Sequence, residues 1–339
     1  RTQSFRWWVE LMAAFFSDYG LFVAKVFTAA IIVLIFVVVV IVSAKKKTPP
    51  DGLSVEHLNK RFEHFSNVLH AAVLGKEKFK KLLKEDKKEK KKKKKNQNKE
   101  GVTRNCVYVL DFKGDIRATA TASLREEVSA VLAVATKDDQ VLVRLENSGG
   151  TVHEHGLAAS QLMRIKEHGV PLVVSVDKVA ASGGYLMACV ADRIIAAPFA
   201  IVGSIGVIAQ LPNFHRFLEK RGVDFEQITA GRFKRTLTVF GKNTEEGREK
   251  MQEEIEDVHT LFKHQIAEHR PNVELEETAT GEHWYGLRAL ELKLIDEIST
   301  SDDYLMGVSK KYELYRVTYK RRRSIPERLL GGAENLLSR

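Results

Sequence analysis

Four apolar runs of strand length recur in the second part of the chain. They are rich in Val and Ile and cover residues 106–112, 141–145, 172–176 and 194–197. Continuous apolar runs of this length predict strands that are largely buried. Helical patterns lie between them, and strand–helix alternation indicates βαβ units. The pattern therefore predicts an α/β fold with a mostly parallel sheet.

Three segments have the spacing of helices. Residues 123–132 open with Ser-x-x-Glu, the arrangement of a capping box, before apolar positions at helical spacing. Residues 156–168 are amphipathic and end before Gly-Val-Pro, which is a stop signal. A long polar helix is expected over residues 244–270, because Pro271 ends it.

The beginning of the chain follows another pattern. Residues 21–42 form an apolar run that carries no charge from Val26 onward. About 20 apolar residues are needed to cross a hydrocarbon core of ~30 Å. The run is longer than the apolar region of a cleaved signal peptide, and a buried core helix is the less favoured alternative. We therefore expect an N-terminal extension at residues 1–18 and a single transmembrane anchor at 19–44.

Residues 45–100 are expected to form a juxtamembrane helix and a Lys-rich linker. Apolar positions between residues 58 and 73 have nearly heptad spacing, which fits a self-association stalk or a helix packed on the body. Residues 76–99 hold fourteen lysines and four acidic residues. Like charges repel and stay solvated, which predicts a flexible linker. Anionic lipid headgroups are the partner that this tract would attract in a bilayer.

The net charge of +10 is unevenly placed. Residues 1–100 hold 22 Lys+Arg and 10 Asp+Glu, a net charge of +12, whereas the remainder holds 32 and 34, a net charge of −2. The body is thus a weak candidate for binding nucleic acid, and we expect no such partner. The two cysteines, Cys106 and Cys189, cannot supply a four-ligand zinc site, and we expect neither metal nor cofactor.

Four glycine-containing loops follow the expected strands. Ligands of parallel α/β proteins gather at the carboxyl ends of strands, where the first two of these loops lie. Ser182 stands in the second loop, before an apolar helical stretch whose N-terminus supplies backbone donors. Its Ser-Gly-Gly tripeptide alone favours an N-cap rather than a nucleophile. The four loops are residues 146–150, 179–185, 202–207 and 230–235.

A serine nucleophile needs a base, and histidine and lysine are both possible. Lys234 stands in the fourth loop beside Arg235 and would have to be neutral to accept a proton. Taken alone, a lysine in such a loop is most often simply exposed. The histidines to be considered are His153, His155, His215, His259, His264, His269 and His283, none of them in a glycine-flanked turn.

Together these loops resemble the signal peptide peptidase A family of serine peptidases. The resemblance runs from residues 17–22 to about residue 300. It implies a ClpP/crotonase-like fold for a catalytic domain at residues 101–339, with a Ser-Lys dyad. The most specific stretches are residues 176–185, 197–207 and 243–248, and residues 279–286 also match.

The resemblance also implies a role for individual residues. Ser182 matches the nucleophile, Lys234 the general base and acid, and Ser204 a serine that orients the lysine. The oxyanion hole would be formed by backbone amides of Gly149, Gly150 and Gly183. In one departure from the family pattern Ser-Pro-Gly-Gly, Ser148 takes the position of the proline, so the loop is expected to be less rigid.

The expected protein is a membrane-anchored serine endopeptidase of the bacterial inner membrane. It would form a homo-oligomeric ring and hydrolyse short or unfolded apolar peptides, such as signal-peptide remnants, in envelope quality control. The basic flank favours the cytoplasmic side for the body, whereas the family role also fits the periplasm. The alternatives are a noncatalytic ring-forming membrane scaffold and an acyl-CoA enzyme of the crotonase type.

Overall fold

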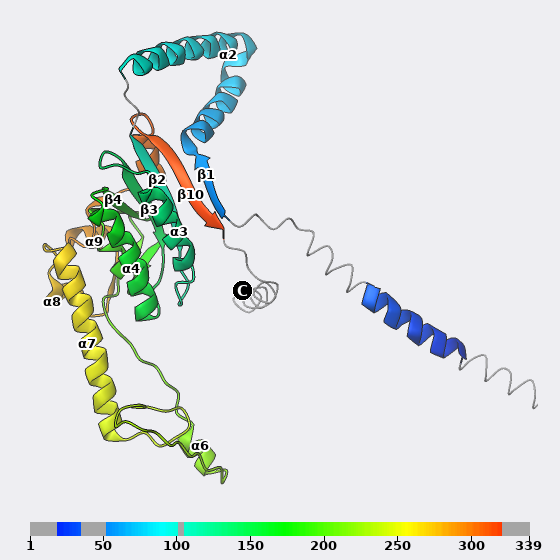
Figure 1. Ribbon diagram of the computed structural model, residues 1–339, viewed down its shortest axis with the longest axis vertical. Helices are drawn as coiled ribbons and strands as arrows, with labels where there is room; N and C mark the ends of the chain where they lie inside the picture. The colour runs from blue at the N-terminus through cyan, green and yellow to red at the C-terminus, as the bar shows by residue number, and fades with distance from the viewer. Residues whose placement is uncertain (1–18, 35–51, 101–104, 321–339) are drawn as a thin grey trace, which may run out of the picture. The chain divides into compact units, whose positions relative to one another are not determined.

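The computed structural model describes residues 19–34, 52–100 and 105–320 of the 339-residue chain (Figure 1). Gly52–Tyr319 form a compact body, and the helical residues 19–34 belong to a separate unit. No helix within the described ranges is both long and apolar enough to cross a membrane. The predicted extension at residues 1–18, and the predicted anchor beyond residue 34, lie outside the described residues.

A seven-stranded sheet forms the centre of the body, in the order β1-β10-β2-β3-β4-β6-β9. All neighbouring pairs from β10 to β9 are parallel, which confirms the predicted α/β fold. The four predicted strands correspond to β2, β3, β4 and β6, with ends that differ by at most one residue. The strands are β1 (Gly52–His57), β2 (Cys106–Lys113), β3 (Gln140–Glu146), β4 (Leu172–Val176), β6 (Arg193–Ala196), β9 (Glu297–Ile298) and β10 (Glu313–Lys320).

A second sheet has three short strands: β5 (Val179–Ala181), β7 (Ile201–Gly203) and β8 (His283–Tyr285). β5 and β7 are parallel neighbours, whereas β8 runs antiparallel to β7. Because this sheet begins three residues after β4, it displaces the second glycine loop from the end of the main sheet.

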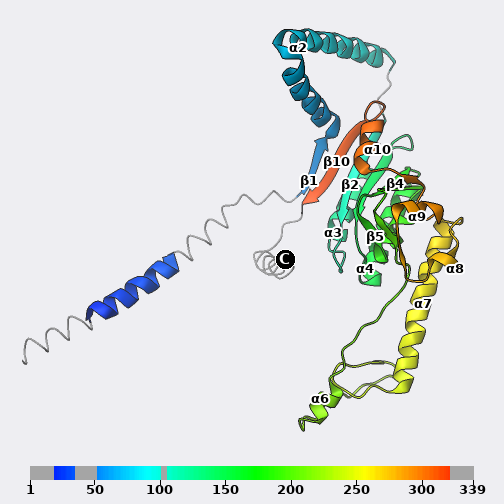
Figure 2. The ribbon, with the colours of Figure 1, turned by 180° about the vertical axis from the view of Figure 1, so that it is seen from behind.

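Helices cover both faces of the main sheet. One face packs against α3 (Thr121–Leu132), α4 (Val152–Glu167), α5 (Gly183–Ala188) and α7 (Glu245–His269). The other face is covered by α10 (Ser301–Val308) and by the start of α2 (Leu58–Glu100) (Figure 2). Side chains of β2 alternate between the two faces, as the two-residue period of a strand requires. The shorter helices are α6 (His215–Glu219), α8 (Leu275–Thr278) and α9 (Gly286–Glu291).

The start of α3 differs from the prediction. The N-cap position is Ala120, which makes no side-chain cap bond in the described chain, so the predicted capping box is wrong. The carboxylate of Asp115 accepts the backbone N–H groups of Arg117 and Thr119 at 3.2 and 2.9 Å. This turn leads the chain into the helix before Ser123 is reached.

The other two predicted helices are confirmed. α7 begins and ends within one residue of the prediction, and the Thr244 hydroxyl caps it by accepting the Gly247 N–H at 3.1 Å. α4 begins at Val152, four residues before the predicted start. Residues 152–155 therefore belong to a helix rather than to a loop, which decides where His155 lies.

Only the first turns of α2 pack on the body. Leu58 is buried, and Phe62 packs beside it on the second face of the sheet. Gly75 interrupts the helix with a φ of 70°. The segment expected to be a flexible Lys-rich linker is helical up to Glu100, which agrees with the good helix propensity of Lys and Glu. The remaining apolar residues of the stalk pattern are exposed: Phe65, Leu69 and Val73.

Candidate active site

Ser182 lies where β5 ends and α5 begins. Its backbone has φ 52° and ψ −121°, a conformation that residues other than glycine rarely adopt. It occupies the N-cap position, yet among the described residues its hydroxyl makes no cap bond. The Ser182 N–H donates to the Gly203 carbonyl at 2.7 Å, which ties the turn to β7. The capping role favoured by the tripeptide is therefore not the role seen, and the hydroxyl is available for chemistry.

Ser204 lies beside Ser182. Ala181 and Gly203 are register partners on the parallel strands β5 and β7, so the serines that follow them are neighbours. Ser204 also has a φ of 52°, and its N–H donates to the Glu282 carbonyl at 2.7 Å. The structure thus brings together these two predicted site residues.

The first glycine loop lies directly against Ser182. A Cβ atom added to Gly149 would come within 2.7 Å of the Ser182 Cβ, and the φ of Gly149 is 88°. Both facts require glycine here. The preceding Asn147 is buried, and its Oδ1 accepts the Gly149 N–H at 2.8 Å. This asparagine turn holds the loop at the point where the family pattern places its Ser-Pro pair.

The backbone amides of the three predicted oxyanion glycines are not equivalent. The Gly149 N–H is already engaged with Asn147, so it is not free to bind an oxyanion in this arrangement. The amides of Gly150 and Gly183 have no partner in the part of the chain that the structure describes. The Gly183 N–H is also the first of a helix, where N–H groups lack intrahelical partners. Two of the three amides can therefore receive developing negative charge.

His155, one of the histidines considered as a base, lies beneath this turn. It is fully buried, and a Cβ added to Gly183 would come within 2.5 Å of its ring. Its ring contacts the Thr151 carbonyl and the Asn147 side chain, and no hydrogen bond joins it to Ser182 in the described chain. Starting the helix at residue 152 would have placed His155 on the apolar face with Ala159 and Leu162.

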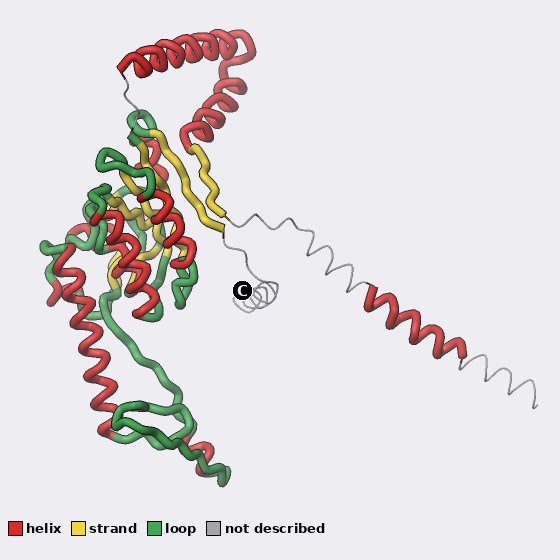
Figure 3. The backbone as a smooth tube through the Cα atoms, viewed as in Figure 1, coloured by secondary structure: helices red, strands yellow, loops and turns green. Residues whose placement is uncertain are grey.

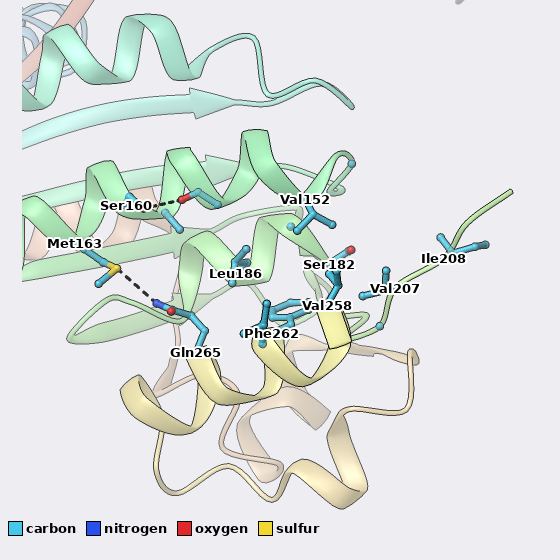
Figure 4. Close-up of a pocket in the computed structure, with 16 residues that line it drawn as sticks. Val152, Ser160, Met163, Ser182, Leu186, Val207, Ile208, Val258, Phe262 and Gln265 are labelled. Carbon is cyan, nitrogen blue, oxygen red and sulfur yellow. Dashed lines mark hydrogen bonds between the residues drawn. The ribbon is translucent and has the colours of Figure 1, made fainter. Parts of the chain in front are cut away.

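A cavity of about 390 Å³ opens beside Ser182. Its walls are mainly apolar side chains of α4, α5 and α7, together with the residues that follow β7. Figure 4 shows Ser182 near Val207 at one end of the cavity and the pair Met163 and Gln265 at the other. There the Gln265 amide donates to the Met163 sulfur at 3.5 Å. The cavity therefore offers an apolar chain a path of several side chains in length.

Lys234 is exposed, and no hydrogen bond joins it to Ser182 in the described chain. It belongs to residues 208–244, which we call the arm (Figure 3). Neighbours of Lys234 contact the first turns of α7, since Arg232 pairs with Glu246 and Phe233 lies 5.6 Å from the Lys250 amine. Ser182 shares its cavity with Val258, eight residues beyond Lys250 and so roughly 12 Å further along the helix. The predicted Ser-Lys pair is not assembled within one copy.

A cysteine thiol also lies near the site. Burial raises the pKa of the Cys189 thiol to about 12, so this cysteine of the α5 end stays protonated at neutral pH and is a poor nucleophile. Within residues 19–34, 52–100 and 105–320, no group of three or more His, Cys, Asp and Glu side chains is placed to hold a metal ion.

Comparisons with known proteins show which family the chain belongs to. The family model described as Peptidase family S49 N-terminal matches residues 14–162, and that described as Peptidase family S49 matches residues 164–314. A Probable protease SohB from Haemophilus influenzae is 47% identical over 318 residues, covering 91% of this chain and 90% of that protein. A Probable protease SohB from Buchnera aphidicola subsp. Acyrthosiphon pisum is 55% identical over 232 residues, 68% of this chain and 69% of that protein.

More distant likenesses follow. A Putative signal peptide peptidase SppA from Enterococcus faecium is 31% identical over 181 residues, 52% of each chain. A mutant of the 1510-N membrane-bound stomatin-specific protease aligns with a TM-score of 0.41 and 14% identity, covering 61% of this chain and 85% of that one. The predicted family resemblance is confirmed by the matches that span both halves of the body, and the chain belongs to peptidase family S49.

Proposed function

We propose that the protein is a serine endopeptidase and that Ser182 is its nucleophile. The observation that carries this proposal is the Ser182 turn itself. A strained backbone holds a hydroxyl that is not used for capping, at the end of an apolar cavity and next to two unpaired amides. Strain of this kind persists where function requires it. We base the proposals of a ClpP/crotonase-like fold and of a serine mechanism on the family that the loops of this protein resemble.

Lys234 is proposed as the general base, supplied by a neighbouring copy of the chain. Within one copy it is separated from Ser182 along α7. The arm that carries it is long and mostly irregular, and segments of this kind are commonly functional. Ile228 in the arm is 97% exposed, and many of its other large apolar residues are exposed too. These side chains would be covered if the arm lay against another subunit of a homo-oligomeric ring.

The chemistry follows from these positions. The neutral amine of Lys234 takes the Ser182 proton as the hydroxyl oxygen bonds to the peptide carbonyl carbon. The Gly150 and Gly183 amides stabilise the oxyanion, and such a donor contributes about 3 kcal/mol in other hydrolases. The protonated lysine gives its proton to the leaving amine as the C–N bond breaks. Water then attacks the acyl carbon and gives a proton to the lysine, which passes it to the Ser182 oxygen as the acyl–oxygen bond breaks, so that the acid product and the free serine are released.

The substrate class follows from the cavity. Its apolar walls suit the side chains of short or unfolded apolar peptides, such as remnants of signal peptides. The opening lies beside the nucleophile, so an apolar side chain next to the cut bond would be bound there. A role in envelope protein quality control is the corresponding physiological proposal.

We also propose that the chain is a single-pass protein of the bacterial inner membrane. The first support is the apolar run at residues 21–42, which is long enough to cross a bilayer. The second is the Lys-rich tract at 76–99, whose positive charge would attract anionic lipid headgroups. The basic flank favours a cytoplasmic body, whereas envelope quality control favours a periplasmic one. Reporter fusions at the C-terminus, active on only one side of the membrane, decide between the two.

The dyad is tested by hydrolysis of an unstructured apolar polypeptide by the detergent-solubilised protein. Ser182→Ala and Lys234→Ala are each expected to abolish cleavage, whereas Lys242→Ala, an exposed lysine of the same arm, is the matched control and should keep it. Co-assembly of the two inactive variants should restore part of the activity, because some sites then combine an intact serine with an intact lysine. Retained cleavage in either single variant removes that residue from the dyad. Absence of complementation contradicts a lysine supplied in trans.

A further inference from the structure

His155 is a buried titratable side chain that the proposed chemistry does not use. It lies in the first turns of α4, and its ring packs under Gly183, directly after the nucleophile. Its Nε2 lies 3.2 Å from the Asn147 Oδ1, and its Nδ1 lies 2.9 Å from the Thr151 carbonyl oxygen. The ring therefore lies between the start of α4 and the loop that carries the oxyanion glycines, and a neutral imidazole can donate to only one of these two oxygens.

The N–H of Gly149 determines which atom of the Asn147 carboxamide faces His155. A backbone N–H can only donate, so the Asn147 atom 2.8 Å from the Gly149 nitrogen must be the carbonyl oxygen. The same oxygen faces His155 Nε2, which must carry a proton to bond with it. The Asn147 amide nitrogen is turned toward the Met187 sulfur at 3.6 Å. The orientation of the carboxamide is thus fixed from both sides.

Asn147 is closely held by its surroundings. It is 1% exposed, its N–H donates to the Val179 carbonyl at 2.9 Å, and its own carbonyl accepts the Ala181 N–H at 3.0 Å. A Cβ added to Gly114 would come within 2.5 Å of its amide nitrogen. A displacement of the side chain would therefore act on Gly149, which touches Ser182, and on the adjacent Gly150 amide.

We infer that His155 is a positioning residue that acts through Asn147 to hold the Gly149–Gly150 loop against Ser182. The bond from His155 Nε2 keeps Oδ1 aimed at the Gly149 N–H, and that turn aims the Gly150 amide at the reacting carbonyl. This device provides the rigidity that a loop without the family's proline would otherwise lack. The inference rests on the proposed function, since it assigns the loop to oxyanion binding.

Two near-isosteric variants separate this role from simple filling of space. In His155→Gln the amide nitrogen lies near the position of Nε2 and can still donate to Asn147. In His155→Asn it lies near Nδ1 and can bond only the Thr151 carbonyl. We expect kcat to fall about 10- to 100-fold in His155→Asn with KM changed by less than about twofold, and to stay within about threefold of the parent in His155→Gln. Equal effects of the two variants on kcat would overturn the inference.

A second measurement does not need catalysis. Hydrogen exchange of the Gly149 amide, in the full chain in detergent, should be faster in His155→Asn and Asn147→Ala and unchanged in His155→Gln. If His155→Asn does not fold, His155→Leu replaces it, because it fills the buried site without a donor. Unchanged exchange in the donor-free variant contradicts the inference. Equal cleavage by the parent and Ser182→Ala would instead contradict the proposed function. The exchange result would then still test whether His155 holds the Gly149 turn.

A double-mutant cycle completes the test. If His155 acts through Asn147, then His155→Asn should lower kcat no further once Asn147→Ala is present. Losses that multiply in the double variant would show that the two residues act independently and would refute the assignment.

Discussion

Replacing Ser182 with glycine should make the protein more stable while removing its activity. The backbone at Ser182, with φ 52° and ψ −121°, is open to glycine but strained for any residue with a Cβ. Such strain costs about 1–3 kcal/mol, whereas glycine loses roughly 0.5–1 kcal/mol more chain entropy on folding. The Ser182 hydroxyl makes no hydrogen bond among the described residues, so its removal leaves no buried partner unpaired.

The expected gain for Ser182→Gly is therefore about 1 kcal/mol in the free energy of unfolding. For a body of this size it corresponds to a rise in Tm of roughly 2 °C. Ser182→Ala is the matched control, because it also removes the hydroxyl but keeps the Cβ and hence the strain. Thermal and urea unfolding followed by circular dichroism should place Ser182→Gly above both the alanine variant and the parent. A glycine variant no more stable than the alanine variant would refute the assignment of strain to this turn.

Three further predictions concern other parts of the body. Burial, with a smaller contribution from Asp111, raises the pKa of Glu127 from 4.5 to about 7, so the native state holds the proton more tightly than the unfolded chain. The free energy of unfolding should then fall by about 3 kcal/mol as pH rises from about 4.5 to 7. Glu127→Gln keeps the acceptor for the Tyr319 N–H but does not titrate. Urea unfolding should therefore show the stability of this variant rising relative to that of the parent over the same pH range. Gly156→Leu should fill the cavity, because a Cβ there meets open space, and should raise KM for peptides with large apolar side chains while Gly156→Ala changes little. Tyr185→Phe should lower the free energy of unfolding by about 1–3 kcal/mol, because the Leu294 carbonyl loses its buried donor; an unchanged urea midpoint would contradict this.

Much of the fold was predictable because its strands are buried on both faces. A run such as residues 172–176 is apolar except for Ser175, and its two-sided burial leaves little choice of structure. The end of α7 was predictable because Pro271 cannot continue a helix, and its start because Thr244 can cap one. The start of α3 was not, since the turn made by Asp115 competes with the Ser123 cap.

The candidate site was predictable in part. The position of Ser182 after a strand follows from local pattern, and its role from the resemblance. The use of its hydroxyl could not be read locally, because an N-cap serine and a nucleophile share the same sequence surroundings. The proximity of Ser182 to Ser204 depends on the pairing of β5 with β7, two strands separated by nineteen residues of chain.

By itself, the sequence determined the alternation of strands and helices, the position of the glycine loops, the family and the confinement of excess positive charge to the first hundred residues. These properties depend on neighbours within a few positions along the chain or on similarity over long stretches. The tertiary structure alone decided that Gly149 is engaged by Asn147, that His155 supports the turn beneath Ser182, and that Lys234 lies away from the serine of its own chain. Each of these is a contact, or the lack of one, between segments that only folding brings into range, because hydrogen bonds act over about 3 Å whatever the separation in sequence.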